Sequence, residues 1–253
     1  MKTKLMIGLI TLMLLGLAQP ARAQWQNGNL ALRTNGNVFQ SGDQLRVEVV
    51  ALEAITEAFS TQVVYAYTEP VEEKDEDGKV TTKQTERTRK RDTGPIIENF
   101  GKHQTLVLDD RFHFGDASPA GWYEIRVCIF QGYSGKLMTV LRTCVYHQNA
   151  GADVSSENYC GLYLRGIKRV NNEVFWTFDG WFNADARYSV LLMRSGRVLK
   201  HLIGGVYTSG ERELNLNSIE LDGAAGQSYD ILLHDHQSGL SSTLARSVIP
   251  SAN

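Results

Sequence analysis

The sequence predicts an all-β fold of two tandem immunoglobulin-like β-sandwich domains that follow a cleaved signal peptide. Three observations support this class. Runs rich in β-branched and aromatic residues recur at strand length, turn residues separate these runs, and no long stretch has the apolar period of an amphipathic helix. We therefore expect strands throughout the chain.

Residues 1–23 predict export. Two lysines precede an apolar run over residues 5–18, and Ala21-Arg22-Ala23 follows. A basic start, a short apolar centre and a small-residue cleavage site are typical of a signal peptide, and the run is shorter than the roughly 20 residues of a membrane-spanning helix. No later run is as apolar. We expect a secreted or periplasmic protein with no membrane span in the mature chain.

The mature chain of 230 residues is mildly acidic. Loss of Lys2, Lys4 and Arg22 leaves 23 basic and 28 acidic residues, a net charge of −5. This balance does not favour nucleic acid, which calls for a clustered basic surface. The length fits two ordinary domains. We place them at residues 24–150 and 151–253, because the small polar residues around position 151 form the best linker.

Residues 121–147 contain the clearest hairpin of the first domain. Ile125, Val127 and Ile129 alternate with more polar residues, which indicates a strand with one buried face. Turn residues at 132–135 separate this strand from a second β-branched run. Further strands of the first domain are predicted around Leu45 to Val49, at residues 61–68 and at residues 104–114.

A charged insertion over residues 69–94 interrupts the first domain. Its first half is acidic, its second half is basic, and Asp77-Gly78, a favoured turn pair, lies between them. Folded about this turn, the insertion would form a β-arm with acidic positions across from basic ones. The alternative is a solvated segment without fixed structure, because exposed ion pairs contribute only about 0–1 kcal/mol each.

Two segments of the first domain resemble a known family. The sequences NVFQSGDQLRVEV at 37–49 and SPAGWYEIRV at 118–127 are similar to exported bacterial immunoglobulin-like modules related to the macroglobulins. The resemblance implies a β-sandwich with protein–protein or structural work and no chemistry. Cys128 follows Tyr123 by five residues instead of two, so the disulfide of antibody domains does not carry over.

The second domain is predicted to hold seven short strands. They are expected at residues 159–170, 174–182, 188–193, 197–203, 212–216, 229–234 and 242–249, with turn pairs such as Ser195-Gly196 between them. The segments 178–182 and 229–242 resemble bacterial immunoglobulin-like modules of the TIG type. This resemblance implies a sandwich and adds no site.

Three cysteines in an oxidising compartment predict one disulfide and one free thiol. We favour Cys128 with Cys144 inside the hairpin. A tight turn would set Cys128 opposite Thr139, so this bridge needs a bulge or a different register. Pairing of Cys144 with Cys160 and the absence of any bridge are the alternatives.

Two groups of residues are candidates for ligand binding. Trp181 and Trp122 are candidate glycan contacts if their rings are exposed, although the aromatic residues around Trp181 are also typical of a core. His234 and His236 would share a face of one strand, and His201 could approach them to complete a metal site. Polar residues are also ordinary at the end of a hairpin.

The sequence contains no motif of a known catalytic class. It lacks G-x-S-x-G, H-E-x-x-H and a glycine-rich phosphate loop. We therefore expect a non-catalytic module without catalytic residues, cofactor or metal, acting through contacts with another extracytoplasmic protein. The alternatives are a carbohydrate-binding accessory protein and a metal-dependent hydrolase that uses His234 and His236.

Overall fold

The computed structural model describes residues 28–74, 76–148, 163–170, 173–179, 188–203, 213–215 and 226–248. Every regular element in these ranges is a β-strand, which confirms the predicted all-β class. No helix in these ranges has the length and apolar character needed to cross a membrane. The predicted signal peptide, the predicted domain boundary, Cys160 and Trp181 lie outside the described residues.

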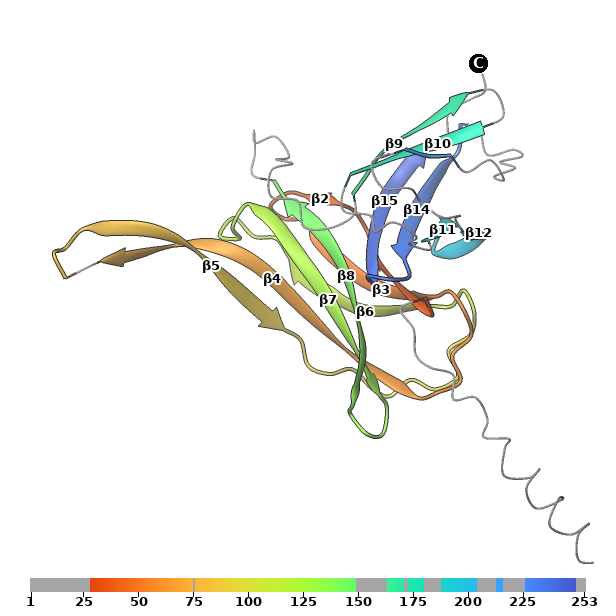
Figure 1. Cartoon of the computed structure of the whole chain (residues 1–253), viewed down its shortest axis with the longest axis horizontal. Helices are drawn as coiled ribbons and strands as arrows, with labels where there is room; N and C mark the ends of the chain where they lie inside the picture. Colours follow the sequence, from red (N-terminus) through yellow and green to blue (C-terminus); the bar gives the residue numbers. More distant parts are fainter. Residues whose placement is uncertain are drawn as a thin grey trace, which may run out of the picture.

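The strands form three sheets (Figure 1). The first half of the chain contributes β1 (Leu30–Thr34), β2 (Val38–Phe39), β3 (Gln44–Ala51), β4 (Phe59–Lys74), β5 (Val80–Lys90), β6 (Thr105–His113), β7 (Gly121–Gln131) and β8 (Leu137–His147). The second half contributes β9 (Tyr163–Val170), β10 (Glu173–Asp179), β11 (Tyr188–Arg194), β12 (Arg197–Ile203), β13 (Glu213–Asn215), β14 (Ser228–Asp235) and β15 (Leu240–Val248). The sheet orders are β1-β3-β6, β13-β10-β9 and β12-β11-β14-β15-β8-β7-β4-β5, and β2 also pairs with β8.

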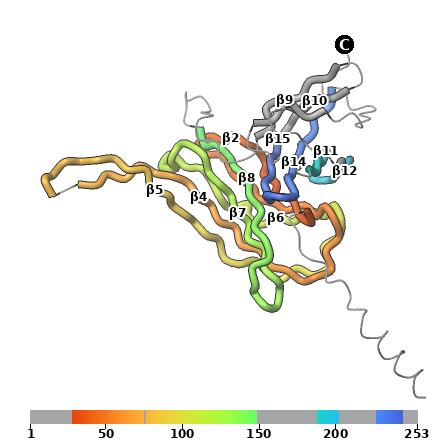
Figure 2. The backbone as a smooth tube through the Cα atoms, in the orientation of Figure 1, coloured from red at the N-terminus to blue at the C-terminus, as the bar shows by residue number. Residues whose placement is uncertain are grey.

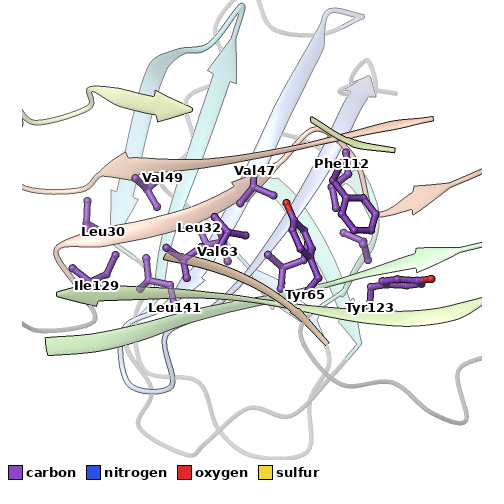
Figure 3. Packing of buried hydrophobic residues seen from close by; sticks show 14 of the residues in the cluster. Leu30, Leu32, Val47, Val49, Val63, Tyr65, Phe112, Tyr123, Ile129 and Leu141 are labelled. Atoms are coloured by element: carbon purple, nitrogen blue, oxygen red, sulfur yellow. The ribbon is translucent and has the colours of Figure 1, made fainter. Parts of the chain in front are cut away.

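The sheet β1-β3-β6 packs against β4, β7 and β8 to form a β-sandwich (Figure 3). The predicted alternation of the strand residues accounts for this core. Val47 and Val49 of β3 face Val127 and Ile129 of β7 across the two layers, and all four side chains are fully buried. Burial of such side chains stabilises the fold by about 1.5–3 kcal/mol each. The predicted sandwich is therefore confirmed for this half.

The hairpin of β7 and β8 is confirmed, but its register excludes the favoured disulfide. A bulge between Ile129 and Phe130 sets Cys128 opposite Val140, and Cys144 lies opposite Glu124. Cys128 is a free, half-buried thiol, whereas Cys144 is disulfide-bonded. The predicted Cys128–Cys144 bridge is wrong because the two residues lie at different levels of the ladder. The partner of Cys144 lies outside the described residues.

A buried carboxylate closes one side of this sandwich, where the edge strands β5 and β6 of the two layers meet. The Asp109 side chain is fully buried and accepts hydrogen bonds from the Tyr65 hydroxyl at 2.6 Å and from Arg91 Nε at 2.5 Å. The Arg111 amide donates a third bond at 3.0 Å. Burial disfavours the ionised form, but these bonds outweigh it and hold the pKa of Asp109 below its ordinary value.

The two halves of the chain share a sheet and an apolar contact. Strand β15 pairs in parallel with β8, so the largest sheet runs from one half into the other (Figure 2). Beside this join, Leu191, Met193 and Leu232 pack against three residues of the first half, namely Ala31 of β1, Val50 of β3 and Leu52, which follows β3.

An ion-pair network joins the halves next to the same contact. The buried Arg33 guanidinium contacts Glu48 at 2.6 Å and also binds Asp230 of β14. The Leu32 amide donates to Ser241 Oγ at 3.2 Å. Strand β1 therefore serves both as part of the first sandwich and as the surface on which the second half rests.

Candidate functional site

The candidate site is a groove at the point where the β4–β5 hairpin leaves the body of the protein. It has a volume of about 810 Å³. This volume is in the range of ligand-binding clefts. It is lined by Ala66, Tyr67, Thr68, Pro70, Gln84, Glu86, Pro119, Ala120, Gly121, Trp122, Glu124, Arg126 and Tyr146.

The groove arises because β4 is longer than its partner β7. Pairing between these strands ends at Tyr67 and Tyr123, whereas β4 continues to Lys74 with β5 alone. Strand β7 starts at Gly121, whose positive φ of 129° favours glycine, and the Tyr123 hydroxyl donates to the Pro119 carbonyl of the preceding loop at 2.9 Å. The departing hairpin forms one wall of the groove, and Pro119 with the start of β7 forms the other.

Two aromatic residues that line the groove contact each other. Trp122 of β7 lies opposite Tyr146 of β8, and their ring centroids are 5.1 Å apart at an interplanar angle of 69°. This edge-to-face contact fixes the Trp122 side chain, which is half-buried. The predicted glycan contact Trp122 thus lies in the groove, whereas Trp181 lies outside the described residues.

The polar lining is organised by Arg126. Its guanidinium donates from Nε to the Glu124 carboxylate at 2.8 Å and lies 3.6 Å from Glu86 of β5. The hydrogen bond to Glu124 raises the pKa of Arg126, so the guanidinium stays charged. The groove therefore presents aromatic edges beside a fixed cation and two carboxylates, an arrangement suited to binding polar ligands.

The sequence analysis missed the partners of Trp122, although the signal was present. Glu124 and Arg126 follow Trp122 at alternate positions of β7, and the predicted alternation puts them on the face opposite Ile125 and Val127. Tyr146 could not be found in this way, because its place depends on the register of β8.

The charged insertion forms an ordered arm, the part of the β4–β5 hairpin made of residues 68–74 and 76–86, which projects from the body (Figure 1). The predicted pairing of acids with bases is mostly wrong, since Glu72 and Glu73 lie opposite threonines. Arg87 and Glu69, at diagonal positions, do form an ion pair of 2.6 Å. In this register most basic residues of β5 lie nearer the root of the arm than the acidic residues of β4 do.

A chain of histidines lies between the two halves of the protein. His103 Nε2 lies 3.4 Å from His201 Nδ1, and the Ser189 hydroxyl lies 2.9 Å from His201 Nε2 and 2.7 Å from His236 Nε2. The predicted approach of His201 to His236 therefore occurs, but a serine hydroxyl lies between the rings. His234 instead contacts Ser241 Oγ at 2.8 Å.

These histidines do not form the predicted metal site within the described residues. The described residues contain no group of three or more side chains that could hold a metal ion. The residues that line the groove include no histidine, cysteine or serine.

Comparisons with known proteins give no family. No family model matches the sequence, and no curated protein matches it. Among solved structures, the chain is similar to a Salmonella α-2-macroglobulin mutant, with a TM-score of 0.28 and 9% identity over 89% of this chain. The chain spans only 15% of that macroglobulin.

Two further solved structures have similar scores. The tandem V-type regions of a v-region-containing chitin-binding protein match with a TM-score of 0.28 and 13% identity, over 85% of this chain and 99% of that chain. The sporulation control protein of Bacillus subtilis matches with a TM-score of 0.27 and 12% identity, over 74% and 88% of the two chains. Scores this low carry no argument about function. The TIG-type likeness of the second half stays a prediction.

Proposed function

We propose that the protein is a secreted or periplasmic, non-catalytic binding module that holds another extracytoplasmic protein at the β4–β5 arm and its groove. The observation that carries this proposal is the arm itself. Beyond residue 67 its side chains are exposed or half-buried, and they contribute nothing to the buried core. An isolated two-stranded hairpin is marginally stable in water, so an ordered arm without a core is better explained by binding than by folding.

The charges of the arm and the chemistry of the groove support a protein partner. Glu86, Glu124 and Arg126 offer fixed charges beside Trp122 and Tyr146, a mixture of the kind found at interfaces between proteins. The disulfide at Cys144 agrees with an oxidising compartment, where such bonds persist.

A shortened arm tests this proposal. The Arg91 amide donates to the Val63 carbonyl at 2.9 Å, so these two residues form a hydrogen-bonded pair of the ladder. In an antiparallel ladder every second pair is hydrogen-bonded, and counting from this pair places Glu69 and Thr85 in another such pair. Replacement of residues 70–84 by Asn-Gly therefore gives a favoured two-residue turn on an intact ladder. We expect unchanged unfolding and loss of the protein that the full chain captures from an extract of the source cell envelope. Equal capture by both chains would refute the proposal.

Carbohydrate binding is a second candidate because Trp122 presents a fixed, half-buried ring in the groove. Affinity electrophoresis in gels with soluble glycans tests it. Trp122→Ala should abolish retardation, whereas Phe130→Ala, on the same face of β7 but outside the groove, should keep it. The absence of retardation of the unmodified protein on every glycan would remove this candidate.

A further inference from the structure

The outer edge of β5 is open. Strand β5 ends the largest sheet, and β4 is its only partner among the described residues. Its 11 residues, Val80–Lys90, are almost all exposed. An open edge of this length offers a row of backbone donors and acceptors to which another strand can add.

The backbone groups that face this open edge can be assigned. Since the Arg91 amide points to Val63 of β4, the alternate residues Lys90, Thr88, Glu86, Gln84 and Thr82 turn their N–H and C=O groups outward. The position of Pro70 agrees with this assignment. Proline has no N–H, and it lies opposite Gln84 in a pair that exchanges no hydrogen bonds.

Four of the five charged residues of β5 are basic, Glu86 being the exception, and three of the basic residues lie on one face. Lys83, Arg87 and Arg89 occupy alternate positions of β5 and therefore project to the same side of the sheet. In the described part of the chain no carboxylate lies within ion-pair distance of Lys83 or Arg89. The Arg89 guanidinium lies 5.8 Å from the centroid of the Phe112 ring, which holds it beside the edge.

This charge pattern excludes one occupant and favours another. Addition of a second copy, β5 to β5, would bring two basic rows together, which is unfavourable. An acidic strand would meet complementary charge. We propose that β5 binds an extended segment of another protein by strand addition, and that this segment has carboxylate side chains at alternate positions. The inference rests on the proposed function and names the chemistry of the partner.

Synthetic peptides test the inference on the full chain. The probe is an 11-residue peptide, the length of β5, in which Glu and Thr alternate. The control has the same composition with all Glu residues in one block. We expect the alternating peptide to bind about tenfold more tightly, because only its carboxylates reach the basic face together. Equal affinity of the two peptides would overturn the inference, since charge alone would then explain binding.

Two variants of the protein separate the basic face from general charge. The double variant Lys83→Glu, Arg89→Glu should lose binding of the alternating peptide. The double variant Lys136→Glu, Lys200→Glu changes the net charge equally at sites away from the arm and should keep it. Equal losses in the two variants would contradict a site on β5.

Methylation of the peptide backbone tests strand addition itself. N-methyl groups on the alternate peptide residues whose backbone N–H groups point to β5 should abolish binding. N-methyl groups on the residues whose N–H groups point away from β5 should not. Equal effects of the two series would overturn strand addition. Failure of the alternating peptide to bind, while the shortened arm still loses the captured protein, would overturn this inference and leave the proposed function standing.

Discussion

Removal of the Tyr65 hydroxyl tests how much the hydrogen bonds of the buried Asp109 stabilise the first sandwich. In Tyr65→Phe the ring keeps its contact with Phe112, whose centroid is 4.3 Å away, and only the 2.6 Å hydrogen bond to Asp109 is lost. Tyr65 and the Asp109 side chain are fully buried, so water does not replace the donor. A hydrogen bond to a charged group contributes about 1.5–3 kcal/mol, and we expect a loss of about 2 kcal/mol in the free energy of unfolding.

Urea denaturation at pH 7 measures this loss, with Tyr67→Phe as the matched control. Tyr67 lies on the same strand and stacks on Tyr123, and in the described part of the chain its hydroxyl has no acceptor. We expect a change below about 0.5 kcal/mol for the control. Equal losses in both variants would refute the reasoning.

The pH dependence gives a second check. Hydrogen bonds hold the pKa of Asp109 below its ordinary value. The stability they supply is therefore complete above the unfolded pKa of about 4 and is lost as the pH falls below it toward the folded pKa. The difference between the native protein and Tyr65→Phe should shrink over that range.

Three further predictions concern the contact between the halves and the free thiol. Arg33→Ala removes the buried cation that contacts the buried Glu48 and the partly buried Asp230, and it should lower the free energy of unfolding by about 3 kcal/mol in urea titrations. Arg46→Ala removes a half-exposed partner of Glu48 and should cost less than about 1 kcal/mol; similar costs would contradict the network. Iodoacetamide should add one label per native chain, slowly and at Cys128, because burial raises the pKa of that thiol, and mass spectrometry without any adduct would contradict a free cysteine. Burial lowers the pKa of His103 and His201, so the native melting temperature should fall from about pH 6.5 downward, and His103→Asn with His201→Gln should flatten this fall; parallel curves would refute it.

Local patterns in the sequence predicted the strands well. The alternation from Ile125 to Ile129 marked the buried face of β7, and the turn pair Ser195-Gly196 joins β11 to β12 with positive φ at both residues. These features depend on neighbours along the chain. A period of two residues and a turn that requires positive φ are both visible in a single sequence.

Features that depend on distant residues were not predictable in this way. Strand β1 was missed because its five residues, all buried, have no alternation, and they contact both halves of the chain. The pairing of β8 with β15 joins Arg142 to Leu240 and leaves no local signal. The disulfide prediction failed because the bulge moves the partner of Cys128 only from the expected Thr139 to Val140, which is still four residues from Cys144.

Photo-cross-linking tests the central proposal, a partner held at the arm and its groove, most directly. A benzophenone amino acid is placed at Gln84 in the arm, at Trp122 in the groove, and at Tyr133, which is 77% exposed in the β7–β8 turn. Irradiation in the source cells should give adducts with the same protein from Gln84 and Trp122 and none from Tyr133. An adduct from Tyr133 alone, or equal adducts from all three positions, would contradict the account.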